Sequence, residues 1–311
     1  MAVFPSPEQL EYVHNNSTER RENGSLLPGT EASEEFSIKY WMRILSLLIT
    51  LVGLVGNGLV LWLLGVRIKR NPFSVYILNL SGADTLFLCC SFLISIHEFI
   101  TYLYFPFMFE VVIYITYMFY TVGLSILAAI STERCLSVLS PIWYKCHRPV
   151  HTSGVVCAVL WTLISLLGVT DFVVCFYVYS DYLCHDFFII EVIWFIIFTC
   201  VLCISSLTLL LRVQCSSQCQ QPPRLYLLVL LTVLVFLLGG LPMGIMDFIW
   251  RFHKVFMPHW LPLLLACVNS SANPFIYFFL GSQRQRRRRE PIRVILQRAL
   301  GDEELGDEMM G

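Results

Sequence analysis

The sequence predicts an all-α membrane protein: a seven-transmembrane helix bundle followed by a short amphipathic cytoplasmic helix. Apolar residues occupy 57% of the 311 positions and charged residues only 14%, whereas a soluble domain carries about 25% charged residues. Seven separate runs are long and apolar enough to cross a bilayer. Basic residues gather after every second run, as is typical of loops that stay in the cytoplasm.

Each run satisfies the length that a membrane requires. A bilayer core is about 30 Å thick, so a spanning helix needs about 20 mostly apolar residues, and only a helix satisfies its own backbone hydrogen bonds in hydrocarbon. A soluble all-helical protein would need a polar face on these segments, which they lack. The runs are Ile44–Val66, Pro72–Ile96, Val111–Thr132, Thr152–Thr170, Phe187–Leu211, Leu225–Met246 and Trp260–Leu280.

The distribution of charge predicts the orientation of the chain. Most of the 21 lysines and arginines follow the first, third, fifth and seventh runs, which places those loops in the cytoplasm and the N-terminus outside the plasma membrane. Three Asn-x-Ser/Thr sequences, at Asn15, Asn16 and Asn23, are expected glycosylation acceptors. We therefore expect an extracellular tail over 1–39, a transmembrane domain over 40–281 and a cytoplasmic tail over 282–311.

The cytoplasmic tail carries two features. The arginines from Arg284 to Arg298 are either a simple stop-transfer signal or part of a specific site. From Pro291 onward, apolar residues recur at helical spacing between basic ones, which predicts an amphipathic helix lying on an anionic leaflet. Its simplest role is to anchor the chain end.

Polar residues inside the spans are the first candidates for function, because ionisable groups are costly in a bilayer. Asp84 lies in the middle of the second run, Asn57 in the first, and Asn269 and Asn273 four residues apart in the seventh. Together they are able to hold a small cation such as sodium, with water. Alternatively, they form a hydrogen-bond network that only holds the helices together.

Two spans contain helix breakers. Pro274 follows Asn273 in the seventh run, and Pro242 follows Gly239 and Gly240 in the sixth. Proline removes one backbone hydrogen bond and bends a helix, so these positions predict kinks, which are either hinges or static bends.

At the end of the third run, Glu133 precedes Arg134. The acid is able to hold the arginine against its own helix in one state and release it in another. The alternative is an arginine that only extends toward the membrane surface.

These residues together resemble the rhodopsin-like receptors. The matching motifs, in order and spacing, are Gly56–Val60, Leu80–Asp84, Glu133–Cys135, Trp161, Pro242 and Asn273–Tyr277. A narrower resemblance, running from about residue 40 to 305, is to the Mas-related G-protein-coupled receptors. It is carried by Arg70–Leu80, Ser131–Leu139, Pro141–Pro149 and Asn269–Pro274.

The resemblance implies roles for individual positions. Arg134, next to Glu133, would reach a heterotrimeric G protein in the active state, and Tyr277 would help to hold that state. Asp84, Asn269 and Asn273 would line a sodium-linked core. The chain departs from most rhodopsin-like receptors at Gly240, where they carry a tryptophan switch, and at Gly123, where a serine is frequent.

The Mas-related resemblance also implies a disulfide between Cys175 and Cys184. Phe109 stands where most rhodopsin-like receptors carry the cysteine that anchors an outer loop, so that loop is not expected to close the pocket. Acids surround the expected pocket mouth, among them Asp171, Asp186 and Glu191. Asp171 matches one acid of relatives that bind cationic ligands, whereas Phe188 replaces the other. An acidic cleft concentrates cations, which favours a basic peptide or amine as ligand; a merely solvated rim is the alternative.

A signalling receptor without catalysis of its own fits these observations best. A retinal protein would need a lysine in Trp260–Leu280, and the His-Glu-x-x-His and Gly-x-Ser-x-Gly patterns of enzymes are absent from the sequence. We expect the bilayer, an extracellular ligand and a G protein as partners, no nucleic acid, and no cofactor other than a sodium ion. A receptor-like protein that does not couple and a transporter are the alternatives.

Overall fold

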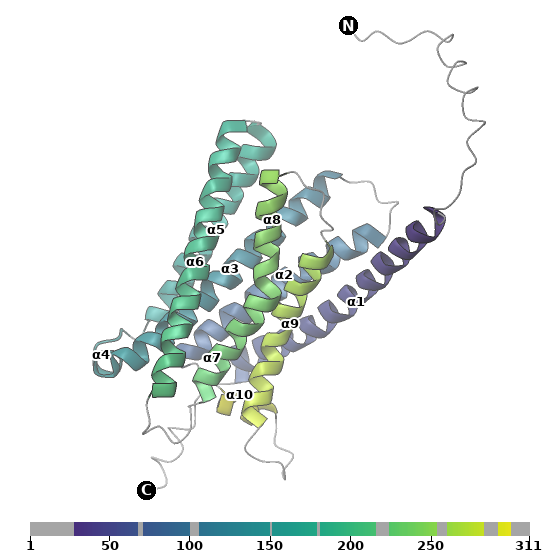
Figure 1. Cartoon of the computed structure of the whole chain (residues 1–311). Helices are drawn as coiled ribbons and strands as arrows, with labels where there is room; N and C mark the ends of the chain where they lie inside the picture. Colours follow the sequence, from purple (N-terminus) through teal and green to yellow (C-terminus); the bar gives the residue numbers. More distant parts are fainter. Residues whose placement is uncertain are drawn as a thin grey trace, which may run out of the picture. The chain divides into compact units, whose positions relative to one another are not determined.

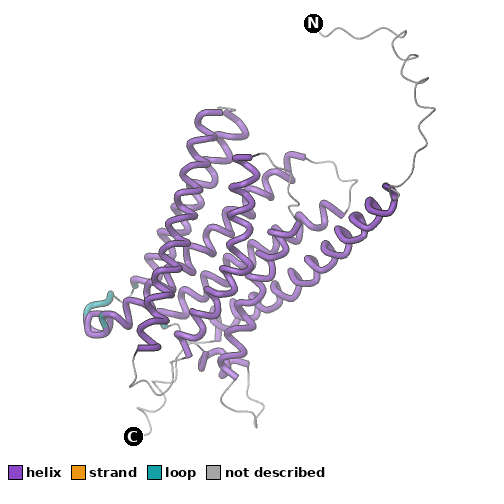
Figure 2. Tube along the Cα trace, viewed as in Figure 1, coloured by secondary structure: helices purple, strands orange, loops and turns teal. Residues whose placement is uncertain are grey.

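The computed structural model describes residues 28–67, 71–99, 106–149, 151–178, 181–215, 224–253, 260–282 and 292–299. The chain divides into two compact units, Met1–Tyr40 and Trp41–Gly311. The expected glycosylation acceptors Asn15, Asn16 and Asn23, and Arg284 to Arg289, lie outside the described residues. The described residues contain no strand (Figure 2).

The described elements are all helices, which follow one another along the chain (Figure 1). In chain order they are α1 (Pro28–Trp62), η2 (Leu63–Arg67), α2 (Pro72–Phe99), α3 (Pro106–Leu139), α4 (Pro141–Cys146), α5 (Thr152–Val173), η3 (Val174–Val178), α6 (Asp181–Cys215), α7 (Arg224–Val235), η4 (Phe236–Gly240), α8 (Leu241–His253), α9 (Trp260–Ser282) and α10 (Ile292–Ala299). The three η elements are π-helical turns.

The seven-helix prediction is confirmed. Among the described residues, seven helical segments are long and apolar enough to cross a membrane, and each corresponds to one of the expected runs. The observed helices extend beyond the runs, because a helix does not end where the hydrocarbon ends. α1 begins at Pro28, inside the segment expected as an extracellular tail, and α3 continues to Leu139.

The sixth span is interrupted at the expected place. It consists of α7, the π turn η4 and α8, and η4 ends at Gly240, two residues before Pro242. Since proline has no backbone N–H, regular α-helical hydrogen bonding cannot continue through this point. Gly239 lets the turn approach α9 closely, since an added Cβ would lie 2.9 Å from the backbone oxygen of Leu265. The seventh span, by contrast, keeps Pro274 inside one continuous helix, α9.

α3 lies at the centre of the second unit. It packs against α2, α5 and α6, and it buries Val122, Ile126 and Ile130 almost completely. Trp161 of α5 ties the neighbouring helices together, because its indole Nε1 donates to Asn79 Oδ1 of α2 at 3.2 Å. α5 and α6 are much less buried than α3, so their many exposed apolar side chains are available to lipid.

Small residues let the second half of α1 approach α9. A Cβ added at Gly53 would collide with the side chain of Ser271, and one at Gly56 would lie 3.1 Å from Pro274 Cβ. Asn57 lies next to them and donates from Nδ2 to the carbonyl oxygens of Gly53 and Ser270. Close approach of small residues and polar cross-links is how helices associate in lipid.

Candidate functional site

Three polar sites lie along the bundle. The first surrounds the C-terminal end of α3 and will be called the basic end, defined by Glu133, Arg134, Tyr144 and Arg148. The second, the core cavity, surrounds Asp84 in the middle of α2. The third, the outer cavity, surrounds Glu191 of α6.

At the basic end, one buried carboxylate gathers three partners. Arg148 Nη2 lies 2.7 Å from Glu133 Oε1, and the Tyr144 hydroxyl donates to the same oxygen at 2.8 Å. Arg134 Nη2 lies 4.0 Å from that oxygen and donates to the Tyr144 hydroxyl at 3.2 Å. The strongest ion pair of Glu133 is therefore with Arg148, whereas the sequence predicted that Glu133 would hold Arg134.

The Arg134 guanidinium is held mainly by aromatic rings. It lies over the ring of Phe73 at 4.6 Å from the ring centre and over that of Tyr144 at 6.0 Å, and a cation over an aromatic face is stabilised by the ring quadrupole. Burial is the main cause that raises the pKa of the Tyr144 phenol above its ordinary value, so this hydroxyl keeps its proton and can donate to Glu133.

Sequence reasoning missed Tyr144, Arg148 and Phe73 as functional residues. They belong to Pro141–Pro149 and Arg70–Leu80, which carried the family resemblance without a stated role. The signal that was available is the basic and aromatic content of the loop after the third run. Arg148 also donates to Ser153 Oγ at the start of α5, which fixes it between the loop and the bundle.

The core cavity contains three of the four expected polar residues. Asp84 is 5% exposed, and its Oδ2 accepts a hydrogen bond from Asn273 Nδ2 at 2.8 Å. Asn269 lines the same cavity, which has a volume of about 20 Å³, room for about one water molecule or small ion. Asn57 does not line it, because its amide is engaged between α1 and α9.

Tyr277, near the C-terminal end of α9, is fully buried. Its hydroxyl has no hydrogen-bond partner among the described residues. An unpaired buried hydroxyl is costly, so a rearrangement of the surrounding helices that gives this group a partner would be favoured.

The outer cavity lies between α3, α5, α6 and α8 and has a volume of about 250 Å³. Its walls are mainly apolar and include seven aromatic residues: Tyr114, Tyr117, Tyr120, Phe188, Trp194, Phe195 and Phe248. Among the described residues that line it, Glu191 is the one acid. Phe188, at the position where the resemblance implied an acid, is buried in this wall.

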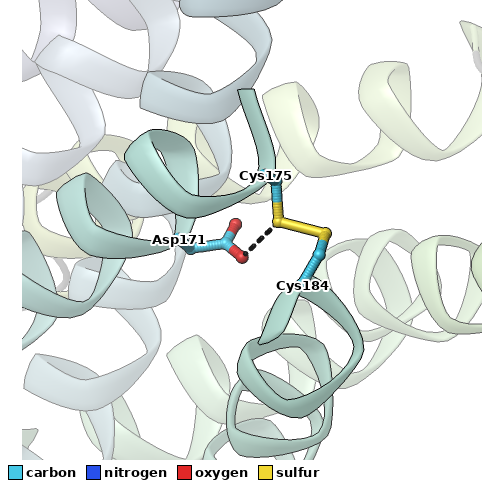
Figure 3. Close-up of a disulfide and its surroundings, with 3 residues drawn as sticks. All are labelled: Asp171, Cys175 and Cys184. Atoms are coloured by element: carbon cyan, nitrogen blue, oxygen red, sulfur yellow. Dashed lines mark hydrogen bonds between the residues drawn. A yellow bond between two sulfur atoms is a disulfide. The ribbon is translucent and has the colours of Figure 1, made fainter. Parts of the chain in front are cut away.

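The three expected ligand-binding acids are not brought together in this cavity. Asp171 is 1% exposed and turns toward the disulfide (Figure 3), where its Oδ1 lies 3.3 Å from Cys175 Sγ. Because that sulfur is bonded to Cys184, it carries no proton to donate. Asp186 is exposed on α6 and does not line the outer cavity.

The disulfide Cys175–Cys184 is present, as the resemblance implied. It joins η3 to α6 across a separation of 9 residues, with Cα atoms 5.0 Å apart. Asp171 and these two cysteines form the one group of three potential metal ligands among the described residues, but bonded sulfurs cannot act as thiolate ligands. Phe109, at the position of the missing loop cysteine, instead stacks on His97 of α2 at 4.4 Å.

Comparison with known proteins finds one family and several close relatives. Residues 56–277 match the family described as 7 transmembrane receptor (rhodopsin family). The Mas-related G-protein coupled receptor member X1 of Homo sapiens is 46% identical over 290 residues, or 90% of this chain and 89% of the relative. Member X2 of Homo sapiens is 50% identical over 274 residues, or 83% and 82%. Member B2 of Mus musculus is 46% identical over 273 residues, or 84% and 81%.

Proposed function

The chain belongs to the rhodopsin family of seven-transmembrane receptors and, within it, to the Mas-related receptors, and from this we propose how its three polar sites divide the work of signalling. It is a G-protein-coupled receptor of the plasma membrane, with an extracellular ligand, and it is not an enzyme. The orientation, the roles of single residues and the ligand class are the proposal.

The basic end faces the cytoplasm, and the N-terminus lies outside. The distribution of lysine and arginine supports this orientation. The position of the disulfide agrees with it, since Cys175 and Cys184 lie at the opposite ends of α5 and α6 from Arg148 and Arg212, and disulfides persist on the oxidising, extracellular side.

The basic end is the coupling site, held in a resting arrangement. The observation that carries this proposal is the pairing of Glu133 with Arg148 of the loop at 2.7 Å, which leaves Arg134 on the aromatic faces of Phe73 and Tyr144. An arginine held by rings and one long ion pair can be released at lower cost than one in a short, fully buried pair. On activation Arg134 reaches the G protein, and the Tyr277 hydroxyl gains a partner.

The outer cavity receives a cationic group. An acid inside an aromatic, low-dielectric wall attracts ammonium and guanidinium groups both by charge and by the faces of the rings. Its volume of about 250 Å³ is below that of most drug-sized sites. It therefore accommodates a small amine, or one basic side chain of a peptide, with Glu191 as the charge partner. Asp171 adds negative potential from beside the disulfide, and Asp186 from the rim.

The core cavity holds a sodium ion in the resting state. Support comes from the neutral partner of Asp84: the amide of Asn273 leaves the carboxylate charge uncompensated. The small volume and the oxygen atoms of Asn269 and Ser270 in the lining suit a single compact cation.

A ligand screen with paired variants tests the proposal. Basic peptides and small amines are applied to cells expressing the receptor, and calcium and cyclic-nucleotide responses are recorded, with Arg134→Ala as the coupling control. Glu191→Gln is expected to weaken the active compounds by about tenfold or more, the loss typical of a charge-assisted hydrogen bond. Asp186→Asn, at the rim, is expected to change them by less than about threefold. Equal effects of the two variants would refute Glu191 as the cation partner.

The same screen tests Asp171. Asp171→Asn is expected to reduce the potency of cationic compounds more at low than at physiological ionic strength, because salt screens a charge that acts from a distance. An unchanged response at low salt would exclude a role for Asp171 in attracting the ligand.

A further inference from the structure

One side chain belongs to both the outer cavity and the core cavity. Tyr120 of α3 lines the two of them, and no other described residue does so. It is buried, and its ring packs near Phe87 of α2, with the ring centres 6.3 Å apart. A ligand that reaches the floor of the outer cavity therefore contacts a residue whose other side faces the surroundings of Asp84.

The hydroxyl of Tyr120 is bonded to the interruption in the sixth span. It donates to the backbone carbonyl oxygen of Gly240 at 2.9 Å, and both groups are buried. Gly240 is the last residue of the π turn η4, and Pro242 follows it in α8. The hydrogen bond thus joins α3 to the one place in this span where regular helical bonding is broken.

Because Gly240 has no side chain, residues that line the core cavity pack directly against it. A Cβ added there would collide with the ring of Phe236, and would lie 3.3 Å from Asn269 Nδ2. Phe236 is buried in this space and, like Asn269, lines the core cavity. Tyr120, Gly240, Phe236 and Asn269 are therefore in contact as a continuous series between the two cavities.

We infer that Tyr120 transmits occupancy of the outer cavity to the sixth span, through its hydrogen bond to the Gly240 carbonyl. A cation that draws the Tyr120 ring or hydroxyl toward Glu191 removes the donor from that carbonyl. A buried carbonyl that has lost a hydrogen bond is unstable where it is, so η4 rearranges, and Phe236 and α8 move with it. This inference rests on the proposed function of the outer cavity as the ligand site.

The test uses basal activity, which needs no identified ligand. Recruitment of a G-protein α-subunit is measured in cells, normalised to receptor at the surface, for the parental chain, Tyr120→Phe and Thr116→Val. Both variants remove one buried hydroxyl from α3, but Thr116 lines neither cavity, and its hydroxyl donates to the Val112 carbonyl of its own helix. Tyr120→Phe is expected to raise basal recruitment by about fivefold, the factor for one buried hydrogen bond, whereas Thr116→Val stays near the parental level.

A second variant acts on the same contact from the other side. Gly240→Ala places a methyl group against Phe236 and is expected to raise basal recruitment as well. Combined with Tyr120→Phe it should add little, because both changes break one connection. If Tyr120→Phe and Gly240→Ala both match Thr116→Val, the inference is overturned.

A tethered cation tests transmission directly. Val192→Cys places a thiol in the wall of the outer cavity, and 2-aminoethyl methanethiosulfonate attaches an ethylammonium group to it. Recruitment is expected to rise over that of the equally treated parental chain, which controls for native cysteines, and this rise should disappear in the Tyr120→Phe background. A rise that persists there would overturn the role of Tyr120, whereas recruitment indistinguishable from Arg134→Ala in every chain would instead contradict the proposed coupling.

Discussion

Two buried carboxylates, Asp84 in the core and Glu133 at the basic end, are stabilised by different kinds of partner. Both are less than 10% exposed. Glu133 has an arginine at 2.7 Å, a second at 4.0 Å and a phenol that donates to it. Asp84 accepts a hydrogen bond from the amide of Asn273, and no described lysine, arginine or histidine forms an ion pair with it.

The difference determines what each site responds to. The charge of Glu133 is balanced by the protein, and one of the balancing groups, Arg148, comes from a loop. Its state therefore depends on where that loop lies. The charge of Asp84 is balanced by nothing within the described bundle, so its state depends on a proton or a cation that enters from outside. The proposed function therefore predicts that Glu133 responds to the position of the loop, and Asp84 to protons and cations.

Removal of the positive charge of Arg148 should have the largest effect on the difference between the two carboxylates. Arg148→Gln leaves Glu133 with only its weaker partners, and an uncompensated buried charge is strongly unfavourable. Glu133 is then expected to draw Arg134 from Phe73 or to move out of the cluster, and basal G-protein recruitment should change by about tenfold or more. Arg148→Lys, which keeps the charge, should lie much closer to the parental receptor. Equal recruitment in all three chains, at equal surface expression, would contradict the proposed resting arrangement at the basic end.

Asp84→Asn tests the other half of the comparison. The parental receptor, purified in detergent, should have a higher unfolding midpoint in sodium chloride than in choline chloride, because an ion that binds only the folded state stabilises it. A concentration of ten times the dissociation constant corresponds to about 1.4 kcal/mol. The variant should lose this difference, since its amide has no charge to attract the ion. A parental midpoint that is the same in both salts would refute sodium binding in the core cavity.

The spans were predictable because composition alone decides whether a segment can enter hydrocarbon. The interruption of the sixth span was also predictable, since Gly239, Gly240 and Pro242 do not support regular helix. The π-helical form of that interruption was not, because it depends on the packing of Phe236 over Gly240 and on the hydroxyl of Tyr120, which lies 120 positions away in the chain.

The sequence predicted Asp171, Asp186 and Glu191 as one group of ligand-binding acids, but only Glu191 lines the outer cavity. Phe188, Glu191 and Phe195 recur at helical spacing and line the same cavity. Asp186 lies five residues before Glu191, on another face of α6, and is exposed. Asp171 lies one turn beyond the cavity-lining Gly168, next to the disulfide. Helical phase keeps Asp186 out of the cavity, whereas Asp171 is excluded because it lies one turn further along α5.

The basic end shows what local patterns cannot supply. Glu133 and Arg134 are adjacent in sequence, so their pairing was the natural prediction. The shortest contact instead comes from Arg148, which is brought back by the short helix α4 and fixed by Ser153 of α5. Such a contact depends on the path of a loop, which the periodicity of the spans does not determine.

Tyr144→Phe is a smaller change at the basic end, and it separates the contribution of the phenol from that of Arg148. It removes the hydroxyl that donates to Glu133 and accepts from Arg134, but it keeps the ring beneath both arginines. Since the ion pair with Arg148 remains, basal recruitment should rise by about fivefold or less, the effect of one hydrogen bond. A larger effect than that of Arg148→Gln would mean that the phenol, rather than the loop arginine, holds Glu133.

Asn57→Ala should have the smallest effect on signalling and separates structural from ion-linked polar groups. Asn57 donates to Gly53 and Ser270 but does not line the core cavity. Its loss should lower the unfolding midpoint, because the Ser270 carbonyl loses a buried partner at a cost of about 1–3 kcal/mol. The difference between sodium and choline chloride should remain, whereas Asn269→Ala, in the cavity wall, should reduce it. If Asn57→Ala abolishes the salt difference as completely as Asp84→Asn does, then the ion-binding site extends to α1 and includes Asn57.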